Sequence, residues 1–430
     1  MTMGTAGKAT LAIPIAMAIA VSIHLAVTTN FGGDNDTYLI LSTFLHLLKS
    51  GVYNPSRFTG YPVAEVGIGY LAWLGGSALS NLGTYLLFLA SALLIPFSLR
   101  RRISFGRYLA FLALALTAPV LAFDNIQSMD YAWALFFWAA GCVCLRRFNN
   151  KMLSVVAMAL SIGSRPSFAL FAVGAIVLTG WEDRDRRLPL WRFPASIAGF
   201  LLATLFAGGL FYLPNWFGHS FGLAWISSAP PDGQGLIGLV GRFVYKTAAA
   251  VGLLQTAVLG IYMAARWLAL RRGSQPERSR PAATNKPNPD DDGRFLLGVM
   301  ALNLLLFMRM PVELSYLQPF LICLFLLLAS LQAKHLSALI GTLILLNLFN
   351  WIAEPEILAI SYRPAGLCGP VVAEGAQIKP ALLPGRVEAF VAAQRLTECH
   401  LRPFANINGT NFINVARKGL PLRLAERAAR

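Results

Sequence analysis

Long apolar runs with basic residues at their ends divide this chain, and this alternation restricts its possible folds more than any other feature. About eleven such runs, of roughly 15 to 23 residues each, approach the length needed to cross a bilayer, although several are short for it. Only 13% of the residues are charged, about half of the fraction usual in a soluble domain. The pattern predicts an all-α polytopic membrane protein with juxtamembrane helices in its first external loop.

The predicted spans are Leu11–Val27, Gly83–Leu99, Tyr108–Ala122, Asp130–Leu145, Met152–Gly163, Ser167–Trp181, Pro194–Leu213, Ala248–Leu270, Phe295–Met308, Tyr316–Leu331 and Leu336–Ile352. A further apolar run, Tyr61–Ser80, is rich in glycine and carries Glu65. We expect it to form a re-entrant or interfacial helix rather than a span.

The distribution of basic residues predicts the orientation. With the N-terminus in the cytoplasm, 20 of the 36 Lys and Arg residues fall in or beside cytoplasmic segments, 6 on the outer side, and 10 in the tail after Ile352. This follows the positive-inside rule and explains the net charge of +16 without a nucleic-acid partner. The first loop, the loop of residues 214–247 and the tail are then extracytoplasmic, and we expect the membrane to be a bacterial inner membrane.

Two domains are predicted. Residues 1–352 form the transmembrane domain, with an external loop over 29–82 and a proline-rich, disordered cytoplasmic linker over 271–294. Residues 353–430 form a small extracytoplasmic domain. In an oxidising compartment its Cys368 and Cys399 are expected to form a disulfide, the alternative being two free buried thiols.

The first external loop concentrates polar chemistry. Asp34 and Asp36 follow the first apolar run, Tyr38 comes two residues later, and an amphipathic segment then leads to the turn-rich YNPSRFTGYP. Ionisable residues at a membrane are costly to place there and usually mark function. The five histidines show no metal-ligand spacing. No cofactor is therefore indicated, and a divalent metal is left open.

GDNDTY followed by an amphipathic helix and PSRFTGYP resembles the first external loop of the GT-C superfamily of glycosyltransferases, which includes protein O-mannosyltransferases and lipid A aminoarabinose transferases. In those families an acidic pair precedes an aromatic residue, and a His-Pro-Pro step follows where this chain has Gly60-Tyr61-Pro62. Asp34 lies four residues before Tyr38, as the first acid does there. The second acid, Asp36, is displaced, so the resemblance leaves open which aspartate is catalytic.

Three later segments extend the resemblance in order along the chain. The first segment is SMDYAWALFFWAAG, which contains Asp130 and is similar to a family helix that begins with Thr-Asp. The second is SIGSRPSFALF, which contains Arg165 and is similar to a short outer turn between two spans of the family. RMPVELSYLQPF, with Arg309, Glu313 and Tyr316, is similar to a late turn of basic residue, proline, tyrosine and proline.

The resemblance implies an inverting glycosyltransferase that uses a polyprenyl-phosphate-linked sugar as donor and a glycan, lipid or protein as acceptor at the outer membrane face. Asp34 or Asp36 would be the general base. The implied substrate-binding residues are Tyr38, Arg57, Tyr61, Asp130, Arg165, Arg309, Glu313 and Tyr316.

Structural roles are open for the same residues. Asp34, Asp36 and Asp130 could cap helices. Arg57 could be a surface charge, and Arg165 could extend its charged end to the membrane interface. Glu313 could pair with Arg309, and Glu65 could be a solvated boundary residue. The competing function is a lipid-linked sugar flippase or another transporter. A transporter would show inverted repeats and mid-span charges, and the sequence shows neither.

Overall fold

The chain forms a bundle of helices. The computed structural model describes residues 5–31, 35–57, 60–184, 192–214, 236–271, 289–309, 313–331, 335–356, 381–384, 387, 415–416 and 418–424. The first half contains α1 (Thr5–Thr28), α2 (Asn35–Ser50), α3 (Pro62–Leu94), the 3-10 helix η1 (Ile95–Ser98), α4 (Phe105–Thr117), α5 (Pro119–Asp124), α6 (Tyr131–Arg146), α7 (Lys151–Ser164), α8 (Phe168–Arg184) and α9 (Arg192–Leu210). The second half contains α12 (Leu236–Val251), α13 (Leu253–Arg271), α14 (Pro289–Arg309), the 3-10 helix η3 (Leu314–Leu317), α15 (Gln318–Ser330) and α16 (Leu336–Ile352).

The helical class predicted from the sequence is confirmed, but the number of spans is not. Among the described residues two helices are long and apolar enough to cross a membrane, Ala9–Thr28 and Pro62–Ser98. A third span results if α12 and α13, which meet at an angle of 93°, are taken together. Seven further apolar helices are shorter.

Helix α3 differs from its prediction. The sequence indicated a re-entrant helix over Tyr61–Ser80 and a separate span from Gly83, whereas one kinked helix runs from Pro62 to Leu94. The kink lies at Gly76, whose φ of 69° is in the left-handed region that glycine adopts without strain. The glycine content that suggested a boundary therefore corresponds to a break in helical geometry at Gly76, within the span of α3.

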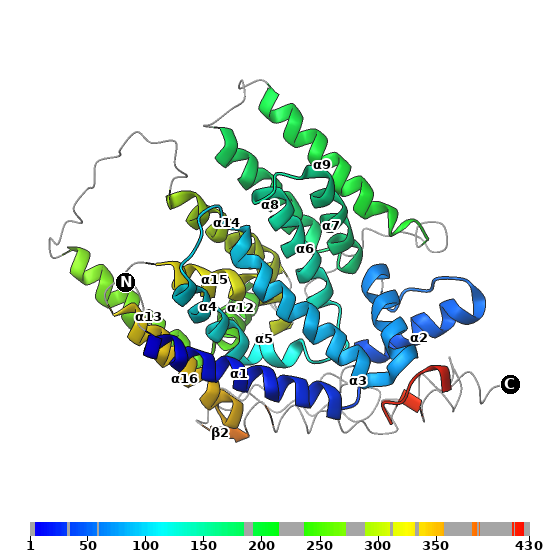
Figure 1. Ribbon diagram of the computed structural model, residues 1–430, viewed down its shortest axis with the longest axis horizontal. Coiled ribbons are helices and arrows are strands. Elements are labelled where there is room, and N and C mark those ends of the chain that lie inside the picture. The colour runs from blue at the N-terminus through cyan, green and yellow to red at the C-terminus, as the bar shows by residue number, and fades with distance from the viewer. Residues whose placement is uncertain are drawn as a thin grey trace.

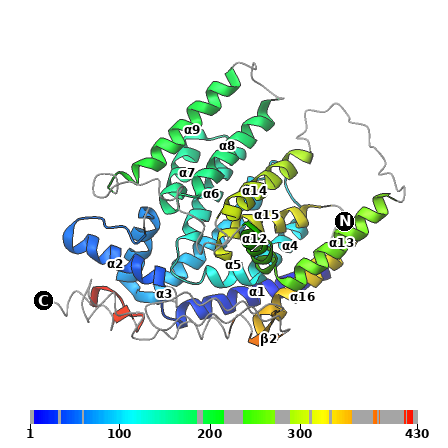
Figure 2. The same ribbon diagram turned by 180° about the vertical axis from the view of Figure 1, so that it is seen from behind.

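Helix α6 is the centre of the first half of the bundle. It packs against α3, α7 and α8, while α1 packs against α3 and α4. Figure 1 shows α9 at the edge of the bundle, beside α7 and α8. Seen from behind, α14 and α15 lie beside each other (Figure 2). Trp138 of α6 is 1% exposed in the apolar core that joins these helices.

A buried ion network marks the end of the bundle where α6 finishes. Arg146 binds Glu182 and Asp292, each at 2.9 Å, and Arg100 binds Glu182 at 2.9 Å. The partners come from α6, α8, α14 and the segment after η1. All lie in or beside segments predicted to be cytoplasmic, so the structure gathers at one end the residues that the charge pattern assigned to one side.

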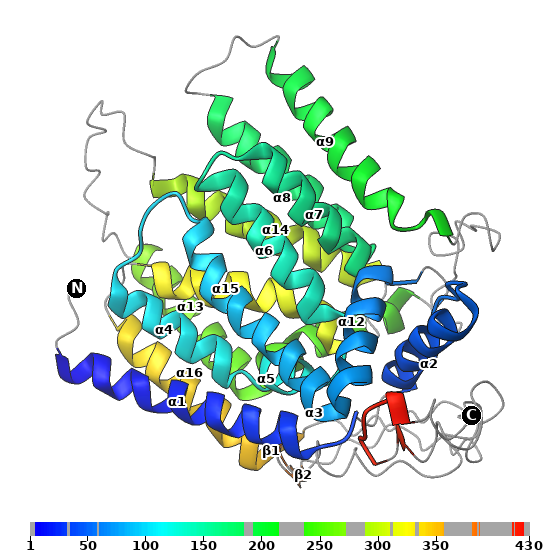
Figure 3. The ribbon, with the colours of Figure 1, turned by 45° about the vertical axis from the view of Figure 1, so that its right-hand side comes forward.

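The chain's last described residues, 415–416 and 418–424, lie against α2 and α3 (Figure 3). Ala416 and Leu422 pack with Phe31 and Tyr38 in a second apolar cluster. The Ser77 amide donates to the Gly419 carbonyl at 3.0 Å, directly after the kink in α3. The tail is thereby attached to the membrane domain at the end that carries the first loop.

A two-stranded antiparallel sheet belongs to the tail as well. It pairs β1 (Ala353–Glu356) with β2 (Ala381–Pro384). The predicted disulfide partners Cys368 and Cys399 and the linker residues 272–288 lie outside the described residues.

Candidate functional site

Arg57 connects the first loop to the bundle. Its guanidinium forms ion pairs with Asp36, in the first turn of α2, and with Asp130, directly before α6, the latter at 3.0 Å. Burial alone would lower the pKa of Arg57, but the neighbouring carboxylates, chiefly Asp130, raise it above its ordinary value. Arg57 is therefore a cation held in place within the site. The alternative that it is only a surface charge, which the sequence allowed, does not hold.

Asp130 is completely buried and binds two arginines. Oδ1 accepts from Arg57 and Oδ2 from Arg165, which follows the C-terminus of α7. It makes no capping hydrogen bond to α6. Asp36, Arg57, Asp130 and Arg165 thus form a chain of alternating charge, in which two carboxylates balance two guanidiniums. Such balance is what allows charged groups to remain ionised away from water.

Three tyrosines surround Arg165. Its guanidinium carbon lies 3.9 Å from the ring centre of Tyr131, 4.8 Å from that of Tyr316 and 5.6 Å from that of Tyr61. Arg165 also donates to the Tyr131 hydroxyl at 3.2 Å, and that hydroxyl donates to Glu313. Arginine over aromatic faces gains cation–π stabilisation. Arg165 is 6% exposed, so it is held inside the site and does not snorkel to a surface.

The first loop is held by Glu65, which is fully buried in the first turn of α3. Its carboxylate accepts from the Tyr53 hydroxyl and from both the hydroxyl and the backbone amide of Ser56, the amide at 3.2 Å. Burial and the Glu65 charge raise the pKa of Tyr53 well above its ordinary value, so Tyr53 remains a donor. Arg57 follows Ser56 directly in the chain. By binding Ser56, Glu65 therefore fixes the position of the Arg57 backbone.

The loop before α6 is fixed in a similar way. The Ser128 hydroxyl lies 2.6 Å from Oδ1 of Asn81 and 2.7 Å from the Ser80 hydroxyl, and Asn81 donates to the Asn30 carbonyl at 2.9 Å. These buried contacts join the end of α1, the middle of α3 and the residue two before Asp130. The position of Asp130 is consequently set by the bundle.

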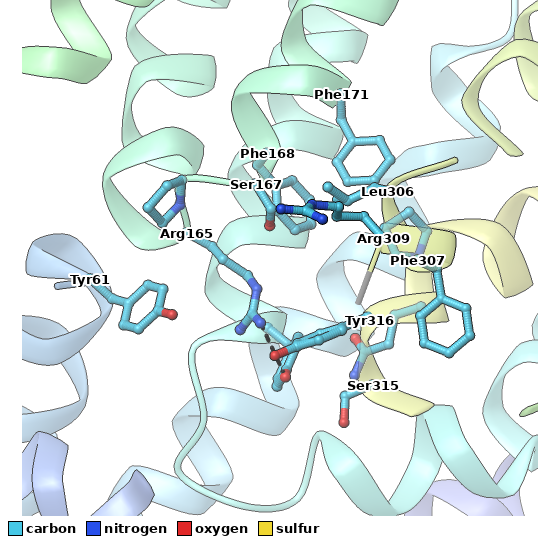
Figure 4. Close-up of a pocket in the computed structure, with 14 residues that line it drawn as sticks. Tyr61, Arg165, Ser167, Phe168, Phe171, Leu306, Phe307, Arg309, Ser315 and Tyr316 are labelled. Atoms are coloured by element: carbon cyan, nitrogen blue, oxygen red, sulfur yellow. Dashed lines mark hydrogen bonds between the residues drawn. The ribbon is translucent and has the colours of Figure 1, made fainter. Parts of the chain in front are cut away.

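A cavity of about 140 Å³ opens beside the ion chain. Arg165 and Arg309 contribute cationic side chains to its wall, and Tyr61, Tyr131 and Tyr316 contribute aromatic ones. Figure 4 shows Tyr61 approaching from one side and Arg309 and Tyr316 from the other. The remaining wall is largely apolar, from α8, the end of α14 and the start of α15. The cavity thus has an anion-binding character within an apolar and aromatic lining.

Most of the residues singled out from the sequence meet at this place. Arg57 and Arg165 both bind Asp130, and both lie over the ring of Tyr61. Tyr316 lines the cavity with Arg309, which is exposed. Glu313 reaches the same cluster through Tyr131. Asp34 lies outside the described residues, and Asp36 is at the edge of the site, with a side chain 23% exposed.

Two assignments change. Tyr38 was expected to bind substrate, but it is 1% exposed, packs in the second apolar cluster and does not line the cavity. Glu65 was interpreted as a solvated boundary residue, yet its carboxylate is inside the protein and holds the loop. The sequence signal for this structural role of Glu65 was the presence of a single acid within an otherwise apolar run. Among the described residues no group of three or more His, Cys, Asp or Glu side chains could hold a metal ion.

No protein-family model and no curated protein matches the chain. A solved structure, that of ArnT from Cupriavidus metallidurans in the apo state, is similar to it, with 19% sequence identity and a TM-score of 0.49. The match covers 76% of this chain and 60% of that chain. This chain therefore spans about three fifths of the length of that structure.

Proposed function

We propose that this protein is an inverting glycosyltransferase that moves a sugar from a polyprenyl-phosphate-linked donor to a glycan, lipid or protein acceptor at the extracytoplasmic membrane face. The observation that carries the proposal is the ion chain from Asp36 to Arg165 beside a cavity with arginine and tyrosine walls. Carboxylate, guanidinium and aromatic side chains are the groups that activate a hydroxyl, bind a phosphate and contact a sugar.

The phosphate of the donor is assigned to the arginines of the cavity. Arg165 is already neutralised by Asp130 and stacked on Tyr131, so it supplies a fixed hydrogen-bond donor. Arg309 is exposed at the end of α14 and lines the same cavity. A guanidinium fork suits a phosphate, and it stabilises the negative charge that develops on a leaving phosphate. We assign Arg309 the direct contact with the phosphate and Arg165 the support of the cavity wall.

The transfer itself needs a base. A carboxylate takes the proton of the acceptor hydroxyl while that oxygen attacks the anomeric carbon, and the bond from this carbon to the phosphate oxygen breaks with its electron pair leaving on the phosphate. A single displacement inverts the anomeric centre. We assign the base to Asp34, because the carboxylate of Asp36 is paired with Arg57, and a guanidinium partner lowers the proton affinity of a carboxylate. Asp36 then positions Arg57.

The membrane placement is part of the proposal. The ion chain and the Arg146 network mark opposite ends of α6, and the sequence assigns the first to the outer side and the second to the cytoplasm. The seven shorter apolar helices would complete the transmembrane domain around the two long ones. The lipid chain of the donor would remain in the bilayer while its sugar reaches the cavity.

One feature favours the transporter alternative. Helices α12 and α13 form a broken pair at Gly252, and broken helices are typical of transport sites. Gln255, just after the break, donates to Asn347 of α16 at 3.0 Å, so a polar contact lies in the apolar part of the bundle. A flippase moves its substrate between two leaflets and makes no new bond.

Transfer in detergent separates these functions, because a micelle has no two sides between which to flip. The purified protein would be mixed with a radiolabelled polyprenyl-phosphate sugar extract and an envelope acceptor fraction. We expect the label to move into the acceptor, and the Asp34→Asn variant to lose this transfer. A wild-type protein that leaves all label on the lipid in detergent, yet exposes it to an external reagent in liposomes, would establish the flippase instead. The sugar and acceptor would follow from comparing envelope glycans with and without the gene.

A further inference from the structure

A second cavity lies at the end of the bundle opposite the ion chain. It has a volume of about 790 Å³ and lies between the end of α3, the turn before α4 and the end of α6. Helix α6 has 16 residues, so the two cavities are separated by about 24 Å at 1.5 Å per residue. The second cavity therefore cannot take the reacting end of a substrate held at Asp130.

The walls of this cavity are aromatic and apolar. Phe97, Phe105 and Phe148 line it and are 57%, 62% and 69% exposed. Tyr108 packs edge-on against Phe97 with ring centres 6.0 Å apart. Exposed rings beside a long apolar wall suit contact with acyl chains.

Its charged lining is cationic only. Arg102 and Arg147 are the two ionisable residues of the wall besides Tyr108. Arg147 donates one hydrogen bond to the Arg100 carbonyl at 3.5 Å. Within the described part of the chain, neither Arg102 nor Arg147 forms an ion pair. Two carboxylates at this end of the bundle, Glu182 and Asp292, are bound by Arg100 and Arg146. Among the described residues, the positive charge of the cavity has no carboxylate partner.

We propose that this cavity binds an anionic phospholipid, with the headgroup phosphate between Arg102 and Arg147 and the acyl chains along the phenylalanine wall. Charge complementarity and the volume support this occupant, since basic pockets between helices on the cytoplasmic side bind anionic headgroups. A free phosphate would leave the apolar wall exposed. A zwitterionic phospholipid would bring its own cationic group beside the two guanidiniums and would therefore neutralise them less.

Native mass spectrometry of the full chain tests the proposal. The protein would be titrated with phosphatidylglycerol and with phosphatidylcholine of the same acyl chains. We expect tighter binding of phosphatidylglycerol, and the double variant Arg102→Gln/Arg147→Gln should weaken it roughly thirtyfold, given about 1 kcal/mol for each basic residue. The matched control is Arg101→Gln/Lys151→Gln, which removes two exposed cations from the same end outside the cavity lining.

Three outcomes would overturn the proposal. Equal weakening in both double variants would show that diffuse surface charge attracts the lipid. Unchanged binding in Arg102→Gln/Arg147→Gln would show that the two arginines point into solvent and do not contact the lipid headgroup. Displacement of phosphatidylglycerol by millimolar inorganic phosphate would show that the apolar wall contributes nothing.

Discussion

Arg57 and Asp130 are 73 residues apart in sequence and meet at 3.0 Å, so one ion pair joins the first loop to the start of the central helix α6. Asp130 carries this pair and the pair with Arg165 on the two oxygens of one fully buried carboxylate. Loss of that single charge would leave Arg57 with Asp36 alone and would remove the carboxylate partner of the buried Arg165.

The first prediction concerns this buried charge. Asp130→Asn is expected to destabilise the protein by roughly 3–5 kcal/mol, the range for breaking a buried ion pair by removing one partner. Thermal unfolding in detergent measures it as a lower Tm. The control is Asp36→Asn, which removes the other partner of Arg57 at a site where the side chain is 23% exposed and should lower Tm less. Equal Tm values for the two variants would contradict the claim that Asp130 contributes more to the free energy of unfolding than Asp36 does.

The second prediction separates the two loop aspartates. Asp34→Asn should lower the transfer rate by about 10²–10⁴-fold with an unchanged Tm, because the amide cannot accept a proton. Asp36→Asn should lower the rate less, since it disturbs only the setting of Arg57. Single-turnover transfer from the lipid-linked donor is the measurement. A reversed order would assign the base to Asp36, and wild-type rates in both variants would exclude the loop from catalysis.

The third prediction concerns the phosphate contact. Arg309→Lys keeps the charge but loses the planar fork that binds two phosphate oxygens. We expect a higher apparent KM for the polyprenyl donor or a lower kcat, with Tm nearly unchanged because the side chain is exposed. Steady-state kinetics and thermal unfolding of the same preparation measure both quantities. Normal kinetics with a lower Tm would return Arg309 to a structural role.

The fourth prediction tests the kink of α3. Gly76→Ala should destabilise the protein, because a backbone with φ 69° and ψ −155° is nearly restricted to glycine and costs another residue about 1–3 kcal/mol, and because the new Cβ would lie 2.2 Å from the Gly419 carbonyl oxygen. Gly199→Ala in α9 is the control, since its Cβ would meet nothing within 4 Å. Tm and resistance to protease should fall only in the first variant. A neutral Gly76→Ala would mean that the tail does not lie against the kink.

The fifth prediction tests sidedness with a matched pair of exposed lysines. In a background with the natural cysteines replaced, Lys49→Cys at the end of α2 should react with an impermeant thiol reagent in whole cells. Lys151→Cys at the start of α7 should react only after the membrane is opened. Labelling in the opposite order would invert the topology, and equal labelling in intact cells would place both ends of the bundle on one side.

The sequence predicted the parts of the site that follow a local pattern. Asp130 and Arg165 stand at helix boundaries next to short motifs, and these boundaries meet in the bundle. The partners could not be predicted, because an ion pair such as Arg146 with Asp292 joins positions 146 residues apart and depends on how the helices pack. Glu65 was missed for the same reason, since its burial follows from the loop that folds over it. Tyr38 was misplaced because proximity to acids in sequence says nothing about which side of α2 faces the core.

The contact between Ser77 and Gly419 has a consequence for how the protein is made. The kink at Gly76 interrupts the helical hydrogen bonding, and the carbonyl that receives the Ser77 amide belongs to a segment 342 residues later. Helix α3 leaves the ribosome early, but it cannot complete its bonding until the tail has been synthesised and has reached the same side of the membrane. Assembly of α3 is therefore coupled to the synthesis of the segment around Gly419, and a truncation at about residue 414 should be degraded as an incompletely assembled membrane protein even though every apolar run is intact.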